Sequence, residues 1–425
     1  MRNILKFSVI AAFVATLPIL ASAQIVYNVV SVPGASPSLT AINNPGQVLA
    51  NVGTSTSYNV SVWSRSAGFI GLDLIGINSG GSAMDDFGDV VGAGDPDNSG
   101  IQQAFFWQPA TGVQWLGSLG GGLSAASGVN DDGAVVGLSY NGADFQHAFL
   151  WTAANGMQDL TPNLTSIGGA TAVAINFSNQ VAGYYYPNGS HNTLGFTWTQ
   201  QGGEQDLGPA GTLALAINNA GTVVGQSPNT QLFKHAFSWT QVGGMSDLGT
   251  LGGSESTALG INNNGWIVGT SLTSKKTNIL HAFLWTPAAG MQDLTVLAGI
   301  AKSLQIHSVQ INDFGVIALS TNAGLSILSP KMFATVGSSA NPSALGQSIT
   351  LTATVSSIAG PPPDGEMVQF SVGGRVLGSA PLSGGVAQIS TASIPVGPHV
   401  VTVTYLGDNN YLPSTYQPLK QVVNP

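Results

Sequence analysis

The chain has 425 residues, of which 7% are charged and 43% are hydrophobic, with 56 glycines and no cysteine. This apolar composition excludes a charged, disordered polymer, and the many glycines predict tight turns. Only 10 Lys and Arg residues stand against 19 Asp and Glu residues. A basic surface that neutralises a row of phosphates is therefore excluded, and we expect no nucleic-acid partner.

Residues 1–23 have the pattern of a secretory signal peptide. Arg2 and Lys6 precede an apolar run of about 14 residues, and small residues lead to the predicted cleavage near Ala23. The run is shorter than the roughly 20 residues that a membrane-spanning helix requires, so an uncleaved anchor is the weaker alternative. We expect a secreted protein, periplasmic or extracellular, with no membrane insertion. Without cysteine, its domains depend on packed cores instead of disulfides.

A segment of the form AINNxGxVVG recurs seven times between residues 41 and 319. We call its third position the marker residue, which lies at intervals of 42, 45, 46, 42, 44 and 50 residues. The marker residues are Asn43, Asp85, Asn130, Asn176, Asn218, Asn262 and Asn312. Self-similarity at this period is typical of repeat architectures.

A second motif, HAFLWT in its fullest form, follows the first and places six of the eight tryptophans in register. These tryptophans are Trp63, Trp107, Trp151, Trp198, Trp239 and Trp285. Alternation by twos puts Phe283 and Trp285 on one face of a strand, and the other full copies repeat this arrangement. One such face is sufficient to pack a sheet against its neighbour.

Each repeat predicts four short strands. In residues 259–294, an apolar strand enters the turn at Asn262–Gly265, and a second strand leaves it. The HAFLWT segment supplies a third strand, and the turn at Pro287–Gly290 leads into a fourth. Four-stranded units of this length indicate an all-β fold, a seven-bladed β-propeller spanning residues 24–330.

The ends of the repeat region predict how the ring closes. The segment Ile25–Val32 aligns with the last strand of a repeat, whereas the seventh repeat stops after its third strand near Leu325–Leu328. We therefore expect the N-terminal strand to complete the seventh blade and remove the open sheet edges.

The fullest copies of the second motif resemble the HAF repeat of bacterial extracellular proteins. They are His147–Thr152, His235–Thr240 and His281–Thr286, followed in one repeat by Asp247–Gly253. The resemblance covers most of the propeller and implies export and a repeat scaffold, but no general activity. The departures are Asn59, Gln103 and Leu194 at the His position, and a seventh repeat without Trp.

Residues 333–425 change to alternating Val, Thr and Ser, which predicts a β-sandwich. The stretches 341–350 and 405–414 resemble bacterial Ig-like repeats of secreted and cell-surface proteins. The resemblance implies a spacer, attachment or adhesive module. Within it, we expect Asp408 to cap a turn, and a ligand-facing carboxylate is the alternative.

Two periodic sets of side chains are candidates for chemistry. His147, His235 and His281 suggest a metal set, but a ring holds equivalent positions apart, so we expect a packing or hydrogen-bonding role. A set of aspartates also recurs in register, and turn capping is its expected role. Its members are Asp73, Asp159, Asp206, Asp247 and Asp293. A glycosidase-like pair of carboxylates is the alternative.

One loop departs from the repeat and imitates the start of a calcium loop. Asp95, Asp97 and Ser99 stand at positions 1, 3 and 5, and Gly100 stands at position 6. The twelfth position is Phe106 in place of the bidentate glutamate. Calcium at this loop is a candidate cofactor, and an ordinary polar loop is the alternative; we expect no other cofactor.

The sequence contains no nucleophile elbow, zinc-protease helix, phosphate-binding loop or thiol nucleophile. We therefore expect no enzymatic activity, but a secreted binding, adhesion or surface-scaffold protein. Its propeller would engage an extracellular glycan or protein, with the Ig-like module as spacer or attachment. The alternatives are a polysaccharide-active hydrolase or lyase on a propeller, and a structural protein without a soluble ligand.

Overall fold

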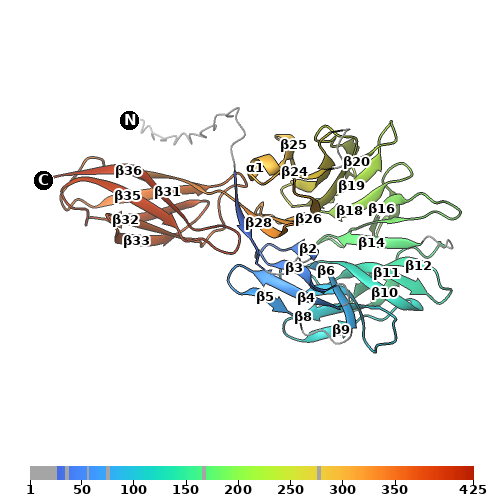
Figure 1. Ribbon diagram of the computed structural model, residues 1–425. Helices are drawn as coiled ribbons and strands as arrows, with labels where there is room; N and C mark the ends of the chain where they lie inside the picture. The colour runs from blue at the N-terminus through green and yellow to red at the C-terminus, as the bar shows by residue number, and fades with distance from the viewer. Residues whose placement is uncertain (1–25, 34–37, 55–56, 73–76, 165–168, 275–278) are drawn as a thin grey trace, which may run out of the picture.

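The computed structural model describes residues 26–33, 38–54, 57–72, 77–164, 169–274 and 279–425. These residues form 36 strands and one short helix (Figure 1). No described helix has the length and apolar character needed to cross a membrane. The predicted signal peptide and Asp73 lie outside the described residues.

Seven antiparallel four-stranded sheets, here called blades 1–7, surround one axis, which confirms the predicted all-β propeller (Figure 1). Blade 1 comprises β2 (Ser38–Ile42), β3 (Val48–Thr54), β4 (Ser57–Ser64) and β5 (Gly68–Gly71). Blade 2 comprises β6 (Ile77–Met84), β7 (Val90–Asp95), β8 (Gln103–Gln108) and β9 (Gly112–Trp115). Blade 3 comprises β10 (Gly120–Val129), β11 (Val135–Asn141), β12 (Gln146–Thr152) and β13 (Gly156–Asp159).

The remaining blades follow the same order from the axis outward. Blade 4 comprises β14 (Ala170–Ile175), β15 (Val181–Tyr185), β16 (Leu194–Thr199) and β17 (Gly203–Asp206). Blade 5 comprises β18 (Leu213–Ile217), β19 (Val223–Pro228), β20 (Lys234–Thr240) and β21 (Gly244–Asp247). Blade 6 comprises β22 (Ser256–Ile261), β23 (Ile267–Leu272), β24 (Leu280–Thr286) and β25 (Gly290–Asp293), followed by α1 (Leu294–Leu297).

Blade 7 is built from both ends of the repeat region. It comprises β26 (Ile306–Ile311), β27 (Ile317–Thr321), β28 (Gly324–Pro330) and, outermost, β1 (Tyr27–Ser31). Strand β1 pairs antiparallel with β28, from Tyr27 opposite Pro330 to Ser31 opposite Ser326. The predicted closure by the N-terminal strand is confirmed. The innermost strands β26 and β2 are also in contact, so blades 7 and 1 complete the ring.

The second motif packs the blades against one another. Phe149 and Trp151 lie in one buried cluster with residues of blade 2, and the predicted shared face is confirmed. Phe149 stands opposite Gly137, the last residue of the AINNxGxVVG segment. A Cβ at Gly137 would lie 2.0 Å from the carbonyl oxygen of Ala125 and 2.8 Å from the Phe149 ring. The glycine is therefore required where the innermost strand bulges toward the second strand.

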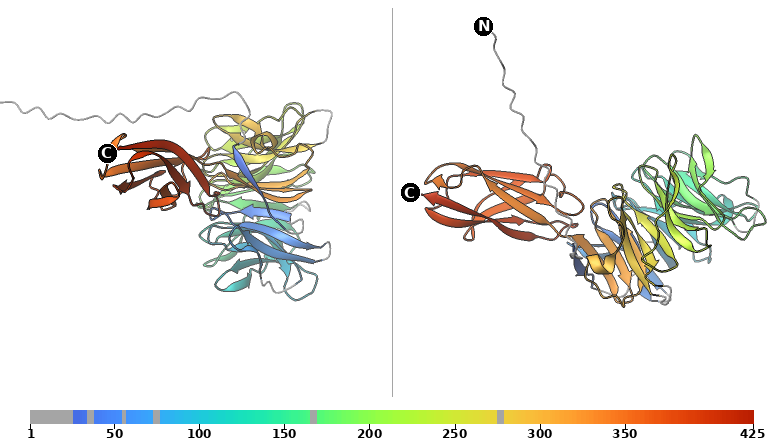
Figure 2. Two further views of the ribbon diagram at one scale, coloured as in Figure 1. Left: turned by 60° about the vertical axis from the view of Figure 1, so that its left-hand side comes forward. Right: turned by 90° about the horizontal axis from the view of Figure 1, so that it is seen from above.

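The C-terminal residues form a sandwich of two sheets, which extends from the propeller beside blades 7 and 1 (Figure 2). One sheet comprises β29 (Phe333–Ser338), β31 (Ile349–Ser356) and β34 (Val386–Thr391). The other comprises β30 (Ser343–Ala344), β36 (Ser414–Asn424), β35 (Gly397–Tyr405), β32 (Met367–Val372) and β33 (Arg375–Pro381). Leu351, Phe370 and Tyr405 are fully buried between the sheets.

Ring closure predicts the effect of deleting the first strand. A chain that begins at residue 32 lacks β1, exposes the edge of β28 and loses the burial of Tyr27, which is 1% exposed. We expect the free energy of unfolding to fall by about 3 kcal/mol or more, and self-association through the open edge to increase. Urea unfolding and size-exclusion chromatography measure the two effects. A chain that begins at residue 24 is the control, and equal stability of the two chains would contradict closure by β1.

Candidate functional site

The marker residues lie in the turns that join the first and second strands of the blades. In blade 3, the backbone carbonyl of Asn130 accepts the N–H of Gly133 at 2.8 Å. The side-chain Oδ1 of Asn130 accepts the N–H of Ala134 at 3.0 Å. One end of the amide therefore closes its own turn and leaves Nδ2 available for the neighbouring blade.

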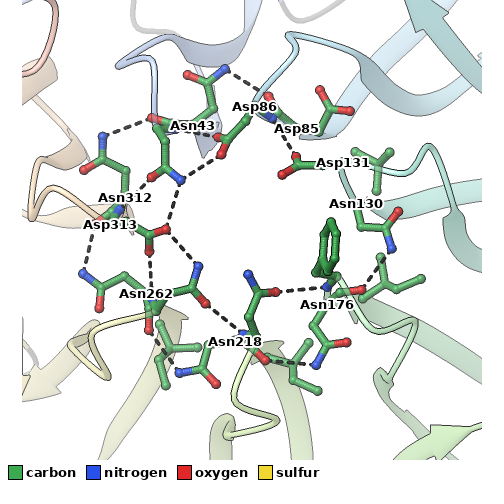
Figure 3. Close-up of a pocket in the computed structure, with 18 of the residues that line it drawn as sticks. Asn43, Asp85, Asp86, Asn130, Asp131, Asn176, Asn218, Asn262, Asn312 and Asp313 are labelled. Atoms are coloured by element: carbon green, nitrogen blue, oxygen red, sulfur yellow. Dashed lines mark hydrogen bonds between the residues drawn. The ribbon is translucent and has the colours of Figure 1, made fainter. Parts of the chain in front are cut away.

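These amides link the blades around the axis, in an arrangement we call the marker ring (Figure 3). Six marker asparagines donate from Nδ2 to the backbone carbonyl of the next marker residue, at 3.0 to 3.1 Å. The link from Asn312 to Asn43 joins blades 7 and 1 at 3.0 Å and closes the ring. All seven marker side chains are buried, so these bonds are shielded from water.

The marker ring is interrupted at Asp85, the one marker that is not an asparagine. Its Oδ1 accepts the N–H groups of Phe87 and Asp89 and closes the turn. Its Oδ2 is buried and has no hydrogen-bond partner among the described residues. Burial, and then the charges of Asp89 and Asp131, raise the pKa of Asp85 to about 7, against the opposing effect of the backbone hydrogen bonds. An ionised Asp85 has no donor for the carbonyl of Asn130.

The residues that follow the markers form a second, more exposed circle, which we call the rim ring. Its members are Asn44, Asp86, Asp131, Phe177, Asn219, Asn263 and Asp313. Here the roles of side chain and backbone are exchanged: the backbone N–H of one member donates to the side-chain oxygen of the next member. Six such links have distances of 2.7 to 3.1 Å. The aspartates among them occupy the structural position that asparagine fills in other blades.

The rim ring is interrupted at Phe177, because its side chain has no oxygen to accept the N–H of Asp131. Phe177 is 54% exposed. It lines the opening of the central channel that the two rings surround, which we call the channel mouth. Both interruptions adjoin the turn of blade 3. Asp85 precedes this turn in the circle, and Phe177 follows it.

Together the rings enclose a polar cavity of about 190 Å³ at the channel mouth (Figure 3). One residue deeper on each innermost strand, an apolar side chain lines the cavity. These side chains are Ile42, Met84, Val129, Ile175, Ile217, Ile261 and Ile311. Four carboxylates line it, from Asp85, Asp86, Asp131 and Asp313, and no lysine or arginine is among its lining residues. Burial raises the pKa of Asp86, whereas hydrogen bonds from Asn44 oppose this effect.

A loop of the C-terminal sandwich docks onto the same rim. Asn410 is 4% exposed; its Oδ1 accepts a hydrogen bond from Asn312 at 2.8 Å, and its Nδ2 donates to the carbonyl of Asn44 at 2.8 Å. Asp408 caps this loop by accepting the N–H groups of Asn410 and Tyr411, so its predicted turn-capping role is confirmed. The sandwich is therefore anchored to the propeller by buried polar contacts.

A second cavity, of about 430 Å³, lies between the propeller rim and the sandwich. Asn44 and Asp86 line both this cavity and the one at the channel mouth. Asn409 and Pro363 line it from the sandwich. The two cavities are therefore adjacent and share one wall.

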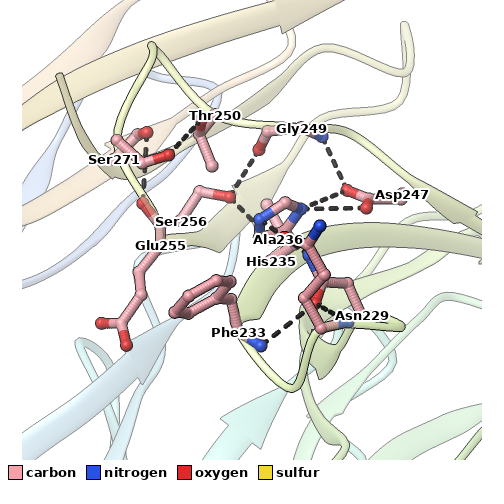
Figure 4. A network of polar contacts seen from close by, with 12 residues as sticks. Asn229, Phe233, His235, Ala236, Asp247, Gly249, Thr250, Glu255, Ser256 and Ser271 are labelled. Atoms are coloured by element: carbon pink, nitrogen blue, oxygen red, sulfur yellow. Dashed lines mark hydrogen bonds and ion pairs between the residues drawn. The ribbon is translucent and has the colours of Figure 1, made fainter. Parts of the chain in front are cut away.

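The histidines of the HAFLWT segments lie on third strands, away from the channel. His235 lies between Asp247 and Asn229: its Nδ1 is 2.9 Å from a carboxylate oxygen of Asp247, and its Nε2 is 3.2 Å from the Nδ2 of Asn229 (Figure 4). His147 pairs with Asp159 at 2.7 Å, and the same pairing in blade 6 measures 2.8 Å. The expected hydrogen-bonding role is confirmed, and the structure does not bring the three histidines together.

The periodic aspartates that the structure describes lie on fourth strands. Asp159, Asp247 and Asp293 cap the turns that follow, as predicted, by accepting a backbone N–H two residues ahead. Asp206 instead accepts a hydrogen bond from the hydroxyl of Tyr185 at 3.0 Å. These carboxylates are therefore not the ones that converge at the channel mouth. The acids at the mouth come from the turns of the first motif.

The candidate calcium loop joins β7 to β8, at the opposite end of the blade from the channel mouth. The buried carboxylate of Asp95 accepts the N–H groups of Ser99 and Gly100. Asp97 is exposed and also accepts the N–H of Ser99. Hydrogen bonds from the side chain and then from the backbone of Ser99 hold the pKa of Asp97 below its ordinary value. Among the described residues, no group of three acidic or histidine side chains is arranged to hold a metal ion. Calcium at Asp95, Asp97 and Ser99 stays a prediction.

Residues 335–424 match the family model of the bacterial Ig-like domain (group 3), which confirms the resemblance found for this module. No curated protein matches the chain. A streptogramin B lyase structure is similar over 73% of this chain and all of its own, at 14% identity and a TM-score of 0.46. The β-propeller domain of the Trilobed protease from Pyrococcus furiosus is similar over 85% of this chain and all of its own, at 8% identity and a TM-score of 0.35. A gluconolactonase from Xanthomonas campestris is similar over 72% of this chain and 98% of its own, at 10% identity and a TM-score of 0.35. At these values, no activity transfers to this chain.

The His–Asp pairs predict that removing the histidine lowers the free energy of unfolding. His147→Ala removes a buried imidazole and leaves the half-buried carboxylate of Asp159 without this partner, and we expect a loss of about 1–3 kcal/mol in the free energy of unfolding. Urea unfolding followed by tryptophan fluorescence measures it. Gln103→Ala, at the equivalent position of blade 2, is the control and should cost less because no Asp faces that position. Equal losses in the two variants would contradict a specific His–Asp contribution.

The interruption at Asp85 predicts a pH-dependent stability. The raised pKa of about 7, against an ordinary 3.8, means that the folded state holds a proton that the unfolded chain releases. This contribution is complete below the ordinary pKa and is lost as the pH rises through about 7. Asp85→Asn supplies a permanent donor to the carbonyl of Asn130. At about pH 8 we expect the variant to be more stable than the original chain by about 1–3 kcal/mol.

Urea unfolding of both chains at about pH 8 and about pH 4.5 measures this difference, which should narrow at the lower pH. Asp132→Asn is the control, because Asp132 is exposed on the neighbouring turn and belongs to neither ring. Equal stabilisation by Asp85→Asn at both pH values would contradict the assignment.

Proposed function

We propose that this chain is an exported, non-enzymatic binding protein whose channel mouth engages an extracellular glycan. The observation that carries the proposal is the polar cavity enclosed by the marker and rim rings, with its adjoining cavity beside the sandwich. Concave sites with a few convergent polar groups are the usual binding sites of small molecules and short chains. A protein ligand is the other outcome of the test below.

The positions of the acids favour binding over catalysis. The carboxylates of Asp86 and Asp313 each accept a backbone N–H from the preceding blade and hydrogen bonds from asparagine side chains. Asparagine fills the same position in other blades, so the acids contribute to the scaffold there. A general acid or base must be free to exchange a proton with the substrate.

The bacterial Ig-like module contributes one wall of the site in this proposal. Its loop at Asn410 is buried against the rim, and the second cavity lies between this loop and the propeller. An extended ligand in the mouth can continue into this second cavity, because the two share Asn44 and Asp86. The module then acts as part of the binding face in addition to any attachment role.

Export is supported by two observations on the sequence. The first 23 residues have the pattern of a signal peptide, and the repeats resemble the HAF repeats of bacterial extracellular proteins. The bacterial Ig-like module is consistent with both.

A polysaccharide-active hydrolase or lyase is the second candidate. The observation that favours it is a buried carboxyl group, Asp85, whose pKa is raised to about 7 beside other acids of the same cavity. Pairs of acids with separated pKa values are typical of glycoside-cleaving sites. The release of sugar distinguishes this candidate from the first.

The test is binding of the labelled chain from residue 24 onward to immobilised polysaccharides and cell-envelope fractions, with released sugar measured in the same wells. We expect saturable binding without product. Product release would contradict a non-enzymatic function, and binding only to protein-containing fractions would contradict a glycan ligand. The same assay with calcium and with a chelator tests the loop at Asp95, with Asp97→Asn as the matched variant.

A further inference from the structure

The interruption of the rim ring at Phe177 places an exposed aromatic side chain between two side chains that each keep one polar atom available for a ligand. Asp131 precedes Phe177, and Asn219 follows it. Asp131 uses Oδ1 to accept the N–H of Asp86, and its Oδ2 has no partner among the described residues. Asn219 uses Oδ1 to accept the N–H of Phe177, and its Nδ2 donates to no described residue.

The same stretch of the other blades is already occupied. Asn44 donates from Nδ2 to both Asp86 and Asp313, and Asn263 donates to Asp313. An exposed aromatic face with a free acceptor on one side and a free donor on the other therefore occurs at a single position of the rim, within the described turns.

We infer that Phe177, Asp131 and Asn219 form a subsite for one pyranose ring of a non-acidic glycan. This inference rests on the proposed function and names its ligand class. The C–H face of a sugar packs against the negatively polarised face of an aromatic ring. The hydroxyl groups at the edge of the sugar donate to Asp131 Oδ2 and accept from Asn219 Nδ2.

The charge of the cavity selects the class of sugar. Its lining residues include four aspartates and no cation, so a uronic acid would bring a like charge into a partly desolvated site. A neutral sugar carries no such cost.

The size and shape of the cavity indicate how the ligand enters. Blades surround it on all sides, apolar side chains lie beneath the marker ring, and its volume of about 190 Å³ accommodates about one sugar ring. The ring at the end of a glycan chain therefore fits, and the following rings extend toward the second cavity. The subsite is an end-recognition site in this geometry.

The decisive variant is Phe177→Asn, which restores the side chain that the repeat uses at this position. Its amide oxygen can accept the N–H of Asp131, so the rim ring is completed while the aromatic face is removed. We expect the thermal unfolding temperature to be unchanged or higher. We expect affinity for the neutral probes to fall by about tenfold or more. Phe177→Trp keeps an aromatic face and should retain binding.

Isothermal titration calorimetry with cellohexaose, mannohexaose, hexa-N-acetylchitohexaose and hexagalacturonate measures the affinities. We expect binding to at least one of the three neutral probes and none to hexagalacturonate. Phe87→Ala is the matched control, because Phe87 is 72% exposed on the turn of blade 2 but does not line the cavity. It should leave the affinity within about twofold.

The outcomes separate this inference from the proposed function. Binding of neutral probes that survives Phe177→Asn unchanged would overturn the subsite and leave a glycan-binding function standing. Preferential binding of hexagalacturonate would overturn the sugar class. No binding of any glycan by the original chain, here and in the polysaccharide panel, would overturn both.

Discussion

The propeller depends on the two-sided hydrogen-bonding capacity of a buried asparagine side chain. The carbonyl oxygen of the amide closes a tight turn within one blade, and the amide nitrogen donates to the backbone of the next blade. An ionised aspartate can perform the first role, but only a group with both a donor and an acceptor performs both. Repeated around the axis, this one contact closes each hairpin and sets the distance between neighbouring innermost strands.

Because one contact is repeated around the scaffold, the positions that lack it can be identified directly. Asp85 interrupts the marker ring and Phe177 interrupts the rim ring, and both adjoin the turn of blade 3. Each interruption removes a hydrogen bond that the other blades make, and at the buried Asp85 it also leaves a carboxylate oxygen without a partner, which is costly. Deviations from local consistency concentrate at functional sites in natural proteins, which is why the blade 3 side of the mouth is the candidate for binding.

Much of the fold could be predicted from the sequence because its signals are local and periodic. The turn residues predicted the strands, the seven copies of the first motif predicted the blade number, and the position of Ile25–Val32 predicted the closure. The rings could not be predicted, because a hydrogen bond between Asn130 and Asn176 depends on how the blades curve around the axis. The His–Asp pairs left a signal that sequence reasoning missed. In each repeat with the histidine, an aspartate follows 12 residues later, whereas Gln103 is followed by Trp115 at that spacing.

The position of the Ig-like module follows from the same closure. Strand β28 ends at Pro330, β29 begins at Phe333, and the N–H of Lys331 donates to the carbonyl of Val26 at 2.8 Å, so the chain leaves the propeller directly beside the closing strand. Because third strands run toward the channel-mouth end of each blade, this exit places the module at the rim. At the junction of blades 7 and 1, the side chain of Asn410 accepts a hydrogen bond from Nδ2 of Asn312 and donates one to the backbone carbonyl of Asn44. The closing strand, the module and the rim are therefore connected, and the module covers the junction of blades 7 and 1 and not the turn of blade 3.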